Sequence, residues 1–486
     1  MRRLSLIVVV LSAMVARAQE PPRWPQFRGV DGRAIAADAK ALPSELNPAK
    51  NLRWKTPVPE GWSSPCIWGE RVFLTAHDPK NQKLDTICID RTDGKVLWRQ
   101  TAPAEKIERV YKVNSPASST PATDGQRVVV YFGSYGLLCY DFTGKEQWRR
   151  PLGPPRAGFG SATSPMFAGD VILLNGQGKD SHLIAVNAKN GETAWTTEGN
   201  LFPSDYPVPM VWPQGKMTEV ILPCRGGLLA FDLKDGKRRW WIPGLSPEAN
   251  SSPTIGDGLL FVATHLPGGD PDRRMTLPPF AELLKKHDKN NDGKLSRQEV
   301  PNDLVIFQRD GKDGVGEIRL NQMFWLFDKN KDNHIDEAEY NSILKTPYQN
   351  SLLAIRPGGD GDISGTHIAF QVKRGAPEVP SPLYYEGRIY MVRNGGILTV
   401  IDAKTGKEAY EQTRLSPGGI FYASPVAGDG KVYLASDAGV LIVLKSSDKH
   451  EVLSETDLGD TIRATPAIVD GVVYVRSAGH LWAFGK

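Results

Sequence analysis

A short motif, Ser or Thr followed by Pro at the head of an apolar run, recurs along most of this 486-residue chain. The copies are Ser64-Pro65, Thr120-Pro121, Ser164-Pro165, Ser252-Pro253, Ser381-Pro382, Ser424-Pro425 and Thr465-Pro466, and Val208-Pro209 fills the one gap. The three successive steps from Pro121 to Pro253 are 44 residues each. Repetition at a fixed spacing of this length indicates a solenoid or a propeller, and it constrains the fold more than any other feature.

Each repeat contains four short apolar stretches, and the turn before the fourth stretch has a signature of its own. It contains Gly and leads to an aromatic residue: Trp98 in IDRTDGKVLW, then Trp148, Trp195 and Trp240, with Tyr410 in that place in IDAKTGKEAY. Gly in such a turn can adopt positive φ, and Pro at the start of a strand need not enter a hydrogen-bond ladder. One aromatic residue per sheet predicts packing between neighbouring sheets.

Four-strand units of this length, repeated eight times, predict an all-β fold, an eight-bladed β-propeller of four-stranded antiparallel blades. The last unit ends at HLWAFGK, before its aromatic strand, and the N-terminal NLRWKTPVP with Trp54 supplies the missing strand and closes the ring. The step from Pro253 to Pro382 is much longer than the others. We therefore expect an N-terminal arm at 19–50, propeller blades at 51–267 and 351–486, and an insert at 268–350 within the fifth blade.

With these repeats the chain resembles the quinoprotein (PQQ-like) eight-bladed propellers. The Ser/Thr-Pro strand starts and the Asp-x-x-x-Gly-Lys-x-x-Trp turns carry the resemblance, over about residues 24–267 and 351–486. The opening WPQFRG is similar to that of secreted bacterial members. The family includes PQQ-dependent alcohol dehydrogenases and non-catalytic scaffolds such as the outer-membrane assembly lipoprotein of the Bam complex. The resemblance therefore implies a fold and leaves the function open.

The resemblance also implies what a catalytic member would carry: a disulfide between adjacent cysteines, a stacking Trp, a Glu and an Asn on a calcium ion, and a catalytic Asp. Here the four cysteines, Cys66, Cys88, Cys139 and Cys224, are far apart, and most Asp in the repeats lie in the Gly-Lys turns. We therefore expect no PQQ and a non-catalytic role, with a PQQ-dependent dehydrogenase-like oxidoreductase as the alternative. For the cysteines, one or two disulfides and buried free thiols both remain open.

The insert contains two stretches, DKNNDGKLSRQE and DKNKDNHIDEAE, that match the calcium loop of an EF-hand position by position. Such a loop places ligands at positions 1, 3, 5, 7, 9 and 12, with position 7 contributing its backbone carbonyl. The ligands predicted in the first loop are Asp288, Asn290, Asp292, Lys294, Ser296 and Glu299. Those in the second loop are Asp328, Asn330, Asp332, His334, Asp336 and Glu339. The sequence thus predicts two Ca²⁺ sites.

Position 6 of these loops is Gly293 in the first and Asn333 in the second, and Asn tolerates the left-handed conformation required there. Apolar residues flank both loops at helical spacing, in PPFAELLKKH, in LNQMFWLF and at Tyr340, Ile343 and Leu344. We therefore expect each loop to lie between amphipathic helices, as a paired EF-hand. The first loop has three carboxylates and the second has four, which predicts tighter binding by the second loop.

The chain opens with MRRLSLIVVVLSAMVARAQ. Two arginines, an apolar run too short to span a bilayer and a small-x-small site predict a signal peptide at 1–18, cut between Ala18 and Gln19. We therefore expect a periplasmic or secreted protein with no membrane span. The net charge of +4 includes three arginines of the signal peptide, so the mature chain has no basic excess to attract nucleic acid.

Loops between second and third strands lie on the same face of a propeller as the connections between blades, because successive strands alternate in direction. The insert belongs to this face, together with Ser134-Tyr135, Gln177 to Lys179, Arg225-Gly226, Arg393-Asn394 and Ser436-Asp437. We expect a monomer that binds an unidentified protein or cell-envelope ligand there, with calcium as a structural or modulating ion. A carbohydrate- or polymer-binding module is a third hypothesis, for which the sequence offers no positive feature.

Overall fold

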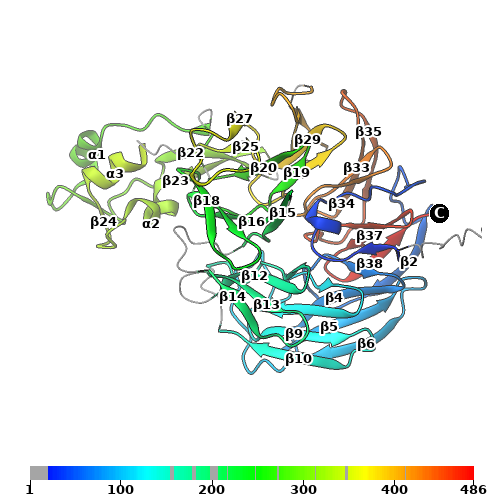
Figure 1. The fold of residues 1–486 in the computed structure, drawn as a ribbon. Helices are drawn as coiled ribbons and strands as arrows, with labels where there is room; N and C mark the ends of the chain where they lie inside the picture. Colours follow the sequence, from blue (N-terminus) through cyan, green and yellow to red (C-terminus); the bar gives the residue numbers. More distant parts are fainter. Residues whose placement is uncertain are drawn as a thin grey trace, which may run out of the picture.

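The computed structural model describes residues 20–486 apart from 154–157, 178–181, 198–205, 216, 247, 267, 271–272, 312–313, 345–348, 411 and 417. The predicted signal peptide, 1–18, lies outside the described residues. Eight sheets, each built on four antiparallel strands, surround one centre, so the predicted eight-bladed propeller is confirmed (Figure 1). The first strands of neighbouring blades contact one another and are therefore the innermost.

The strands of blades one to four follow one another along the chain. Blade one has β3 (Cys66–Trp68), β4 (Arg71–Asp78), β5 (Lys83–Asp90) and β6 (Val96–Thr101). Blade two has β7 (Ala122–Thr123), β8 (Arg127–Phe132), β9 (Gly136–Asp141) and β10 (Glu146–Pro151). Blade three has β11 (Met166–Ala168), β12 (Val171–Gln177), β13 (His182–Asn187) and β14 (Thr193–Thr196). Blade four has β15 (Met210–Gln214), β16 (Met217–Cys224), β17 (Gly227–Asp232) and β18 (Arg238–Pro243), and β26 (Gly361–Asp362) pairs parallel with β18.

Blades five to eight complete the ring. Blade five has β19 (Thr254–Gly256), β20 (Leu259–Thr264), β25 (Ser351–Ile355) and β27 (Ile368–Val372). Blade six has β28 (Leu383–Tyr385), β29 (Arg388–Arg393), β30 (Ile397–Asp402) and β31 (Thr413–Arg414). Blade seven has β32 (Val426–Gly428), β33 (Lys431–Ala435), β34 (Val440–Lys445) and β35 (Val452–Asp457). Blade eight has β36 (Ala467–Val469), β37 (Val472–Arg476), β38 (His480–Phe484) and β2 (Leu52–Pro57).

The Ser/Thr-Pro motif forms the joints between blades on the inside of the ring. At the first joint, the Ser64 N–H of blade one donates to Thr120 Oγ1 of blade two at 2.9 Å. The same bond links Thr120 to Ser164, Val208 to Ser252, Ser252 to Ser381, Ser381 to Ser424, and Ser424 to Thr465. A buried N–H between two blades needs an acceptor, and the hydroxyl of the motif supplies it.

Trp98, Trp148 and Trp195 form the matching joint on the outside, so the predicted packing between sheets is confirmed for them. Trp240 Nε1 instead donates to Glu219 of its own blade, and Tyr410 lies before β31. Trp98 Nε1 donates to the Phe142 carbonyl of the next blade at 3.0 Å, and its ring covers Gly144. The same ring-over-glycine contact pairs Trp54 with Gly94, Trp148 with Gly191, Trp195 with Gly236, and Phe370 with Gly406. A Cβ on any of these glycines would lie 2.8 Å or less from the ring, and all have positive φ, so only Gly fits there.

The two ends of the chain close the ring. β2 pairs antiparallel with β38, and Trp54 lies opposite Ala483. Trp54 Nε1 donates to the Arg91 carbonyl of blade one at 3.0 Å, which makes it the aromatic residue of the closing blade, as predicted. A blade completed by both termini leaves no open edge between the last blade and the first.

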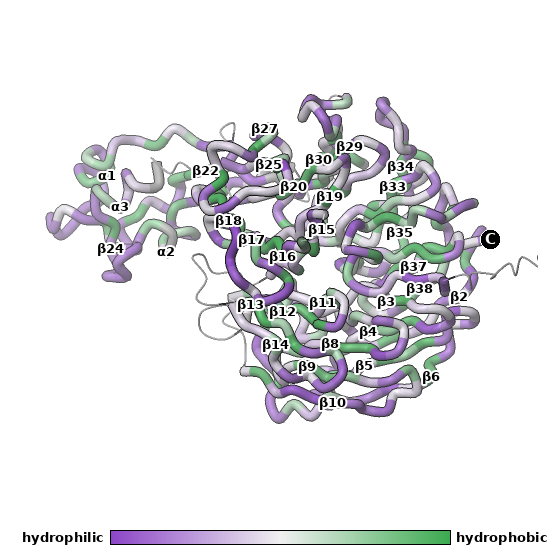
Figure 2. Tube along the Cα trace, in the orientation of Figure 1, coloured by the Kyte–Doolittle hydropathy of each residue, from purple (hydrophilic) through white to green (hydrophobic). Residues whose placement is uncertain are grey.

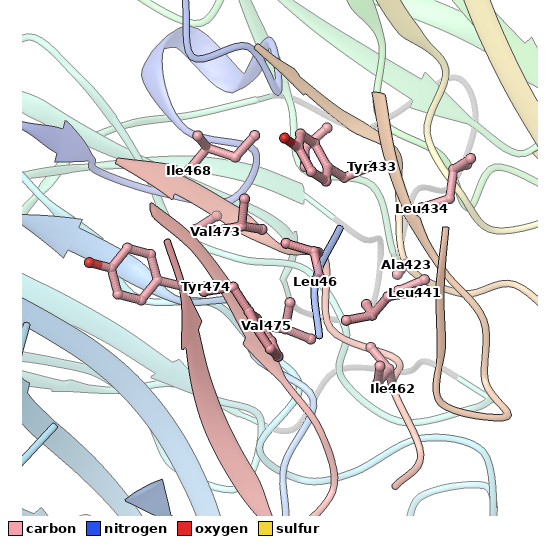
Figure 3. Packing of buried hydrophobic residues seen from close by; sticks show 14 of the residues in the cluster. Leu46, Ala423, Tyr433, Leu434, Leu441, Ile462, Ile468, Val473, Tyr474 and Val475 are labelled. Atoms are coloured by element: carbon pink, nitrogen blue, oxygen red, sulfur yellow. The ribbon is translucent and has the colours of Figure 1, made fainter. Parts of the chain in front are cut away.

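The hydrophobic core lies between the blades, and Figure 2 shows the apolar segments concentrated in the propeller strands. The largest buried cluster joins blades six to eight and blade one to the N-terminal arm. Figure 3 shows Leu46 of the arm close to Val473 and Leu441 of blades eight and seven. Tyr433 from the same cluster donates its hydroxyl to the Pro43 carbonyl at 2.7 Å. The arm is therefore part of the core.

The arm also crosses the centre of the propeller. Its strand β1 (Arg23–Trp24) pairs with β3, and its short helix η1 (Val30–Gly32) contacts β15. Between them, the fully buried Arg28 donates to the carbonyls of Pro253 and Pro382, at 2.9 and 2.6 Å. Burial lowers the pKa of Arg28 to about 9. Further along, the arm packs on the far ends of first strands, so it covers the face opposite the Ser/Thr-Pro starts.

The insert leaves blade five after β20 and returns at β25. Its elements are α1 (Phe280–His287), β21 (Leu295–Ser296), β22 (Val305–Gly311), β23 (Gly314–Arg319), η3 (Leu320–Met323), α2 (Phe324–Phe327), β24 (His334–Ile335) and α3 (Glu337–Leu344). It has a buried apolar cluster of its own, which includes Phe280, Leu295, Phe327, Ile335 and Tyr340. In Figure 1 its helices project away from the propeller, and β22 and β23 lie between the helices and blade five.

The helices predicted around the two loops are correct only in part. α1 precedes the first loop and α3 follows the second. The helix predicted after the first loop is wrong, because the chain turns at Val300 and continues into the β22–β23 hairpin. Pro301 disfavours a helical conformation at the preceding residue, and Val305 and Ile306 favour a strand. The second loop is entered through η3 and the four-residue α2.

The cysteine alternatives are settled by the structure. Cys66, Cys88, Cys139 and Cys224 are all buried, and none forms a disulfide. Burial raises the pKa of both Cys88 and Cys139 to about 12. Within the part of the chain that the structure describes, no helix is both long enough and apolar enough to cross a membrane.

Candidate functional site

The two predicted calcium loops have the same internal structure. In each, the Asp at position 1 accepts a hydrogen bond from the N–H at position 6. Gly293 N lies 3.0 Å from Asp288 Oδ2, and Asn333 N lies 3.1 Å from Asp328 Oδ2. The φ angles of Gly293 and Asn333 are 78° and 63°. Asn333 thus takes the left-handed conformation that its position requires, as predicted.

The remaining predicted ligands repeat the same bonds in both loops. Glu299 and Glu339, at position 12, each accept the N–H groups of positions 2 and 9 at 2.9–3.1 Å. Asn290 and Asn330, at position 3, each accept from the N–H of position 5. Hydrogen bonds to the Glu299 carboxylate, above all the one from the Ser296 side chain, lower the pKa of Glu299 to about 2. Two different sequences therefore form one backbone arrangement.

The loops lie side by side and contact each other. β21 of the first loop pairs antiparallel with β24 of the second, with Leu295 opposite Ile335. Lys294 Nζ lies 2.8 Å from Asp332 Oδ2 of the other loop. In return, His334 Nε2 lies 3.9 Å from Asp292 Oδ2. The side chain at position 7 of each loop therefore lies near the position 5 carboxylate of the other loop.

One carboxylate oxygen in each loop fits a cation ligand. Asp288 Oδ1 and Asp328 Oδ1 are buried and accept no hydrogen bond. A buried carboxylate oxygen without a donor is costly unless a cation or water fills the place. As they stand, no three Asp, Glu, His or Cys side chains among the described residues converge closely enough to hold a metal ion. The residue types and the bare oxygens fit Ca²⁺, and its binding stays a prediction.

A polar junction connects the insert to the propeller. Arg309 in β22 forms an ion pair with Glu378, which precedes blade six. Asn394 Nδ2, in the loop after β29, donates to the other Glu378 oxygen at 2.5 Å. Asn394 Oδ1 accepts the Phe421 N–H, just before blade seven, at 3.1 Å. These contacts form a continuous path from the insert to the entry of blade seven.

The same junction encloses a cavity of about 30 Å³, large enough for water but not for an organic ligand. Arg393 and Asp270 form a buried ion pair beside it, at 2.8 Å. Burial and the nearby Arg309 and Arg393 lower the pKa of His265 to about 3, so this imidazole is neutral. Burial and the charge of Glu378 raise the pKa of Glu248 to about 7. Positively and negatively charged side chains are thus in close contact at this junction.

Three residues before each strand-starting Pro, every blade presents one partly buried side chain. These residues, called the mouth ring here, are Trp62, Ser118, Ala162, Tyr206, Asn250, Val379, Tyr422 and Arg463. The two residues that follow each of them are buried in all eight blades. The mouth ring therefore surrounds the opening of the central channel on the face that carries the blade connections.

Three members of the mouth ring form a stack at blades seven, eight and one. The Arg463 guanidinium carbon lies 4.8 Å from the Trp62 ring centre and 5.3 Å from the Tyr422 ring centre. Asp437 Oδ1 accepts from Arg463 Nε at 2.6 Å, and the Val113 carbonyl accepts from Nη1 at 2.9 Å. These bonds hold the guanidinium against both aromatic rings.

A second aromatic group lies over blades two to four on the same face. Tyr206 of the mouth ring lies 6.3 Å from Phe159 between ring centres, and Phe159 lies 5.1 Å from Tyr111. Phe159 is 52% exposed and Tyr111 is 49% exposed. Large aromatic side chains left this open on a connected surface are typical of binding surfaces.

The loops predicted to line the mouth have mixed outcomes. Asn394 and Asp437 bond to residues at the blade entries, as described above. Ser134 Oγ accepts the Glu108 N–H of the preceding connection at 2.9 Å. The Arg225-Gly226 pair forms the turn between β16 and β17. The remaining predicted loop runs from Gln177 to Lys179, and its residues 178 and 179 lie outside the described part of the chain.

Sequence reasoning missed the mouth ring, Arg28 and Glu378. The mouth ring has a usable signal, because its members stand at a constant offset from the repeated Pro. Arg28 and Glu378 are not part of the repeated pattern, and nothing in their local sequence distinguishes them from charged residues on the surface. Their roles come from partners far away in the chain, Pro382 for Arg28 and Arg309 for Glu378.

Comparisons with known protein families agree with this architecture. The family model described as "Outer membrane protein assembly factor BamB" matches residues 85–266. This span begins in the third strand of blade one, covers blades two to four and enters blade five, which is less than half of the chain. No curated protein matches the sequence.

Solved structures match nearly the whole chain. BamB from Moraxella catarrhalis is 10% identical with a TM-score of 0.53, covering 89% of this chain and 98% of its own. A europium-containing methanol dehydrogenase is 12% identical with a TM-score of 0.57, and the coverages are 96% and 99%. The quinohemoprotein alcohol dehydrogenase from Pseudomonas putida HK5 is 12% identical with a TM-score of 0.55, and the coverages are 96% and 80%.

These identities are low enough that the structural matches establish the fold alone. The chain has a β-propeller fold that is shared with BamB and with quinoprotein dehydrogenases. An assembly factor and redox enzymes use the same architecture, so the function has to be argued from this chain's own residues.

Proposed function

We propose that the protein is a non-catalytic binding or scaffolding propeller of the bacterial periplasm or exterior, with Ca²⁺ held by the two loops of its insert. The observation that carries the proposal is the difference between the two ends of the central channel. The arm lies across the end opposite the Ser/Thr-Pro starts, where Ala36 and Leu42 pack against Gly428 at the end of β32. The other end carries the mouth ring, the exposed aromatic residues and the connection to the insert.

Binding on the mouth-ring face is supported by the path that joins it to the insert. Arg309 pairs with Glu378, and Asn394 connects Glu378 to the entry of blade seven. A partner that contacts both the insert and the mouth ring would be held by one continuous surface. The expected partner is a protein or other component of the cell envelope, bound by a monomer.

The calcium proposal is supported by the equivalence of the two loops. Asp288, Asn290, Asp292, Ser296 and Glu299, with the Lys294 carbonyl, would hold one ion. Asp328, Asn330, Asp332, Asp336 and Glu339, with the His334 carbonyl, would hold the other. Calcium would link the carboxylates within each loop and stabilise the insert, because it binds the folded form.

Localisation outside the cytoplasm is supported by the predicted signal peptide and by the arm that follows it. The arm begins to pair with blade one at Arg23, only a few residues after the predicted cleavage between Ala18 and Gln19. Mass spectrometry of the N-terminal peptide from an expressing bacterium tests this. A mature chain that starts at Gln19 is expected, and an intact Met1 would contradict it.

Capture of partners from a cell-envelope extract tests the binding role. The mature chain, immobilised through its C-terminus, is incubated with extract at about 1 mM calcium or with chelator. We expect a defined set of proteins that is reduced by chelator and by Arg309→Ala. Arg319→Ala is the matched control, because this exposed arginine lies in the same hairpin and contacts Glu317 and the Asn302 carbonyl, both within the insert.

Two results would replace this proposal. Capture unaffected by both chelator and Arg309→Ala would mean that the insert does not contribute to binding. Turnover of an alcohol or aldehyde with a dye acceptor, after reconstitution with PQQ and calcium, would favour the quinoprotein-type oxidoreductase instead.

A further inference from the structure

We propose that the connection between blades one and two binds an acidic segment of a partner protein. This connection, residues 102–119, is called the strap here. The inference rests on the binding role proposed above and names the chemistry of the partner on the same face. The strap, all of whose residues the structure describes, contains no helix or strand. It nevertheless follows a defined path, because several of its groups bond to the entries of other blades.

The strap spans part of the channel mouth. Asn114 Nδ2 donates to the carbonyls of Phe159 and Ser161, just before blade three, at 2.9 and 3.0 Å. The carbonyl of the adjacent Val113 accepts from Arg463, just before blade eight, at 2.9 Å. Blades one and two lie between these two entries in the ring. The strap therefore bridges blades that do not touch each other, and its outer side faces solvent at the mouth.

The side of the strap that faces the protein is held by specific contacts. Glu108 Oε1 accepts the Ser161 hydroxyl at 2.5 Å, and the Glu108 N–H donates to Ser134 Oγ at 2.9 Å. A Cβ on Gly160 would lie 2.4 Å from Val110 Cγ1, so the Val110 side chain packs directly on this glycine. Glu108 and Val110 therefore point inward. A surface that is already ordered in this way loses little conformational entropy when a partner binds.

The outer side of the strap is basic. Lys106, Arg109 and Lys112 are exposed, and no ion pair joins them to another residue in the described part of the chain. Of the two carboxylates in the strap, Glu108 is bonded inward and Glu105 is exposed. Three unpaired cations thus stand against one exposed carboxylate, although the whole chain has a net charge of only +4. Such a local excess attracts a negatively charged partner and disfavours a positively charged one.

Two exposed aromatic rings complete this surface. Tyr111, between Arg109 and Lys112 in the chain, is 49% exposed, and Phe159 is 52% exposed. Their rings meet edge to face at 5.1 Å, and Phe159 also packs against Tyr206 of the mouth ring. The rings thus form a fixed apolar contact beside the cations. A peptide with both carboxylates and aromatic side chains can use the two features together, whereas an inorganic anion uses the charges alone.

Two other anionic partners fit this surface less well. Nucleic acid gains its affinity from many phosphate contacts, and the strap offers three cations. Aromatic side chains that enter a lipid layer project freely from a protein, whereas Tyr111 and Phe159 pack against each other. An acidic peptide segment is therefore the partner that these observations favour.

Fluorescence anisotropy with rhodamine-labelled peptides tests the proposal. The acidic probe repeats Glu-Phe-Glu-Ala three times, and the neutral probe has Gln in place of each Glu. We expect the mature chain to bind the acidic probe, more weakly at about 0.5 M salt, and not to bind the neutral probe. The triple variant Lys106→Gln, Arg109→Gln, Lys112→Gln should weaken binding about tenfold, because each exposed charge pair contributes modestly.

The matched control is the triple variant Lys189→Gln, Lys234→Gln, Lys404→Gln. It removes the same charge from exposed turns between third and fourth strands, which lie on the opposite face, and it should leave binding unchanged. Tyr111→Ala should weaken binding of the acidic probe about threefold. The same substitution should not affect an acidic probe that has Ala in place of Phe.

Absence of binding by the acidic probe, equal binding of the neutral probe, or equal losses in the two triple variants would overturn the proposal. Stronger binding to phosphatidylglycerol vesicles, lost in the strap variant, would overturn it in favour of a lipid surface. Capture of envelope proteins that depends on Arg309 but not on the strap cations would leave the binding role standing and reject only this inference. Strap-dependent peptide binding without any capture would support the strap and reject the wider role.

Discussion

The propeller and its insert are stabilised in different ways. Most propeller joints use a Ser or Thr hydroxyl on the inside, an aromatic ring over a glycine on the outside, or both. The insert has one small apolar cluster and two loops joined by a two-residue pairing, β21 with β24. The propeller repeats an uncharged joint many times, whereas the insert gathers acidic side chains at one place.

This difference has a physical consequence. At the joints described above, the buried N–H groups donate to hydroxyl or carbonyl acceptors of the neighbouring blade. The loops of the insert keep bare oxygens at Asp288 and Asp328. The propeller should therefore be stable without any ion, and the insert should depend on one. The predictions below test this contrast, beginning with the largest effect.

Removing one outer joint should damage the whole propeller. Trp54→Ala takes away the ring that covers Gly94 and the bond to the Arg91 carbonyl, at the blade that closes the circle. We expect a loss of about 3–5 kcal/mol in the free energy of unfolding, measured by urea denaturation. The control Trp325→Ala should change it little. Equal losses for both variants would mean that the closing joint has no special role.

Removing calcium should affect the insert selectively. Without the ion, the calorimetric transition of the insert should move to lower temperature, while the propeller transition stays in place. Stabilisation at a hundredfold excess over Kd amounts to about 2.7 kcal/mol per site. The fluorescence of the exposed Trp325 can report on the insert. A shift of both transitions together would show that the two regions unfold as one unit.

Removing one inner joint should cost less than removing Trp54. Thr120→Val preserves the side-chain shape but leaves the buried Ser64 N–H without its acceptor. We expect a loss of about 2 kcal/mol in propeller stability, because an unsatisfied buried donor keeps its desolvation cost. Thr92→Val, on an exposed turn of blade one, is the control and should have almost no effect. Unchanged stability in Thr120→Val would indicate that water replaces the hydroxyl.

The two calcium loops provide a comparison within the insert. Glu299→Gln and Glu339→Gln each remove one position 12 carboxylate charge, and calorimetric titration measures the calcium affinity that is lost. We expect the larger loss, about tenfold or more, for Glu339→Gln, because the second loop has the greater number of carboxylates. The reverse order would mean that loop geometry outweighs charge.

Repetition explains how much of this molecule could be predicted from its sequence. The spacing of the Ser/Thr-Pro and Gly turns appears in several copies, so the blades, the closing strand and the role of Trp54 follow from comparing them. Single-copy features were missed or wrong. Arg28 bonds to residues more than 200 positions away. The helix predicted after the first loop does not form, because Pro301 disfavours a helical conformation before it and the chain continues into β22 and β23.

The candidate sites differ in the same respect. The loop residues were identified because the ligand order of an EF-hand is strict. The mouth ring was not identified, since its members differ from blade to blade and only their common exposure reveals them. Phe370 was missed for a related reason, because the turn before it lacks the Gly-Lys signature of blades one, two, four and six. Constant residues can be found in a sequence, whereas constant positions with variable residues need the structure.

The smallest predicted effect concerns the contact between the two loops. Lys294 of the first loop places its ammonium group 2.8 Å from Asp332 Oδ2, a predicted ligand of the second loop. This cation competes with calcium for the carboxylate, so Lys294→Gln should increase the calcium affinity of the second loop. The pair is partly exposed, and we expect only a two- to threefold decrease in Kd, about 0.5 kcal/mol, that shrinks at high salt.

Lys331→Gln is the matched control, because it removes one positive charge from an exposed position of the second loop itself. If both variants raise the affinity equally, the effect is one of net charge, and the contact between the loops is irrelevant to binding. If only Lys294→Gln does so, the first loop acts on the second through this ion pair. The insert would then behave as a coupled unit, unlike the propeller, in which each joint is formed by neighbouring blades alone.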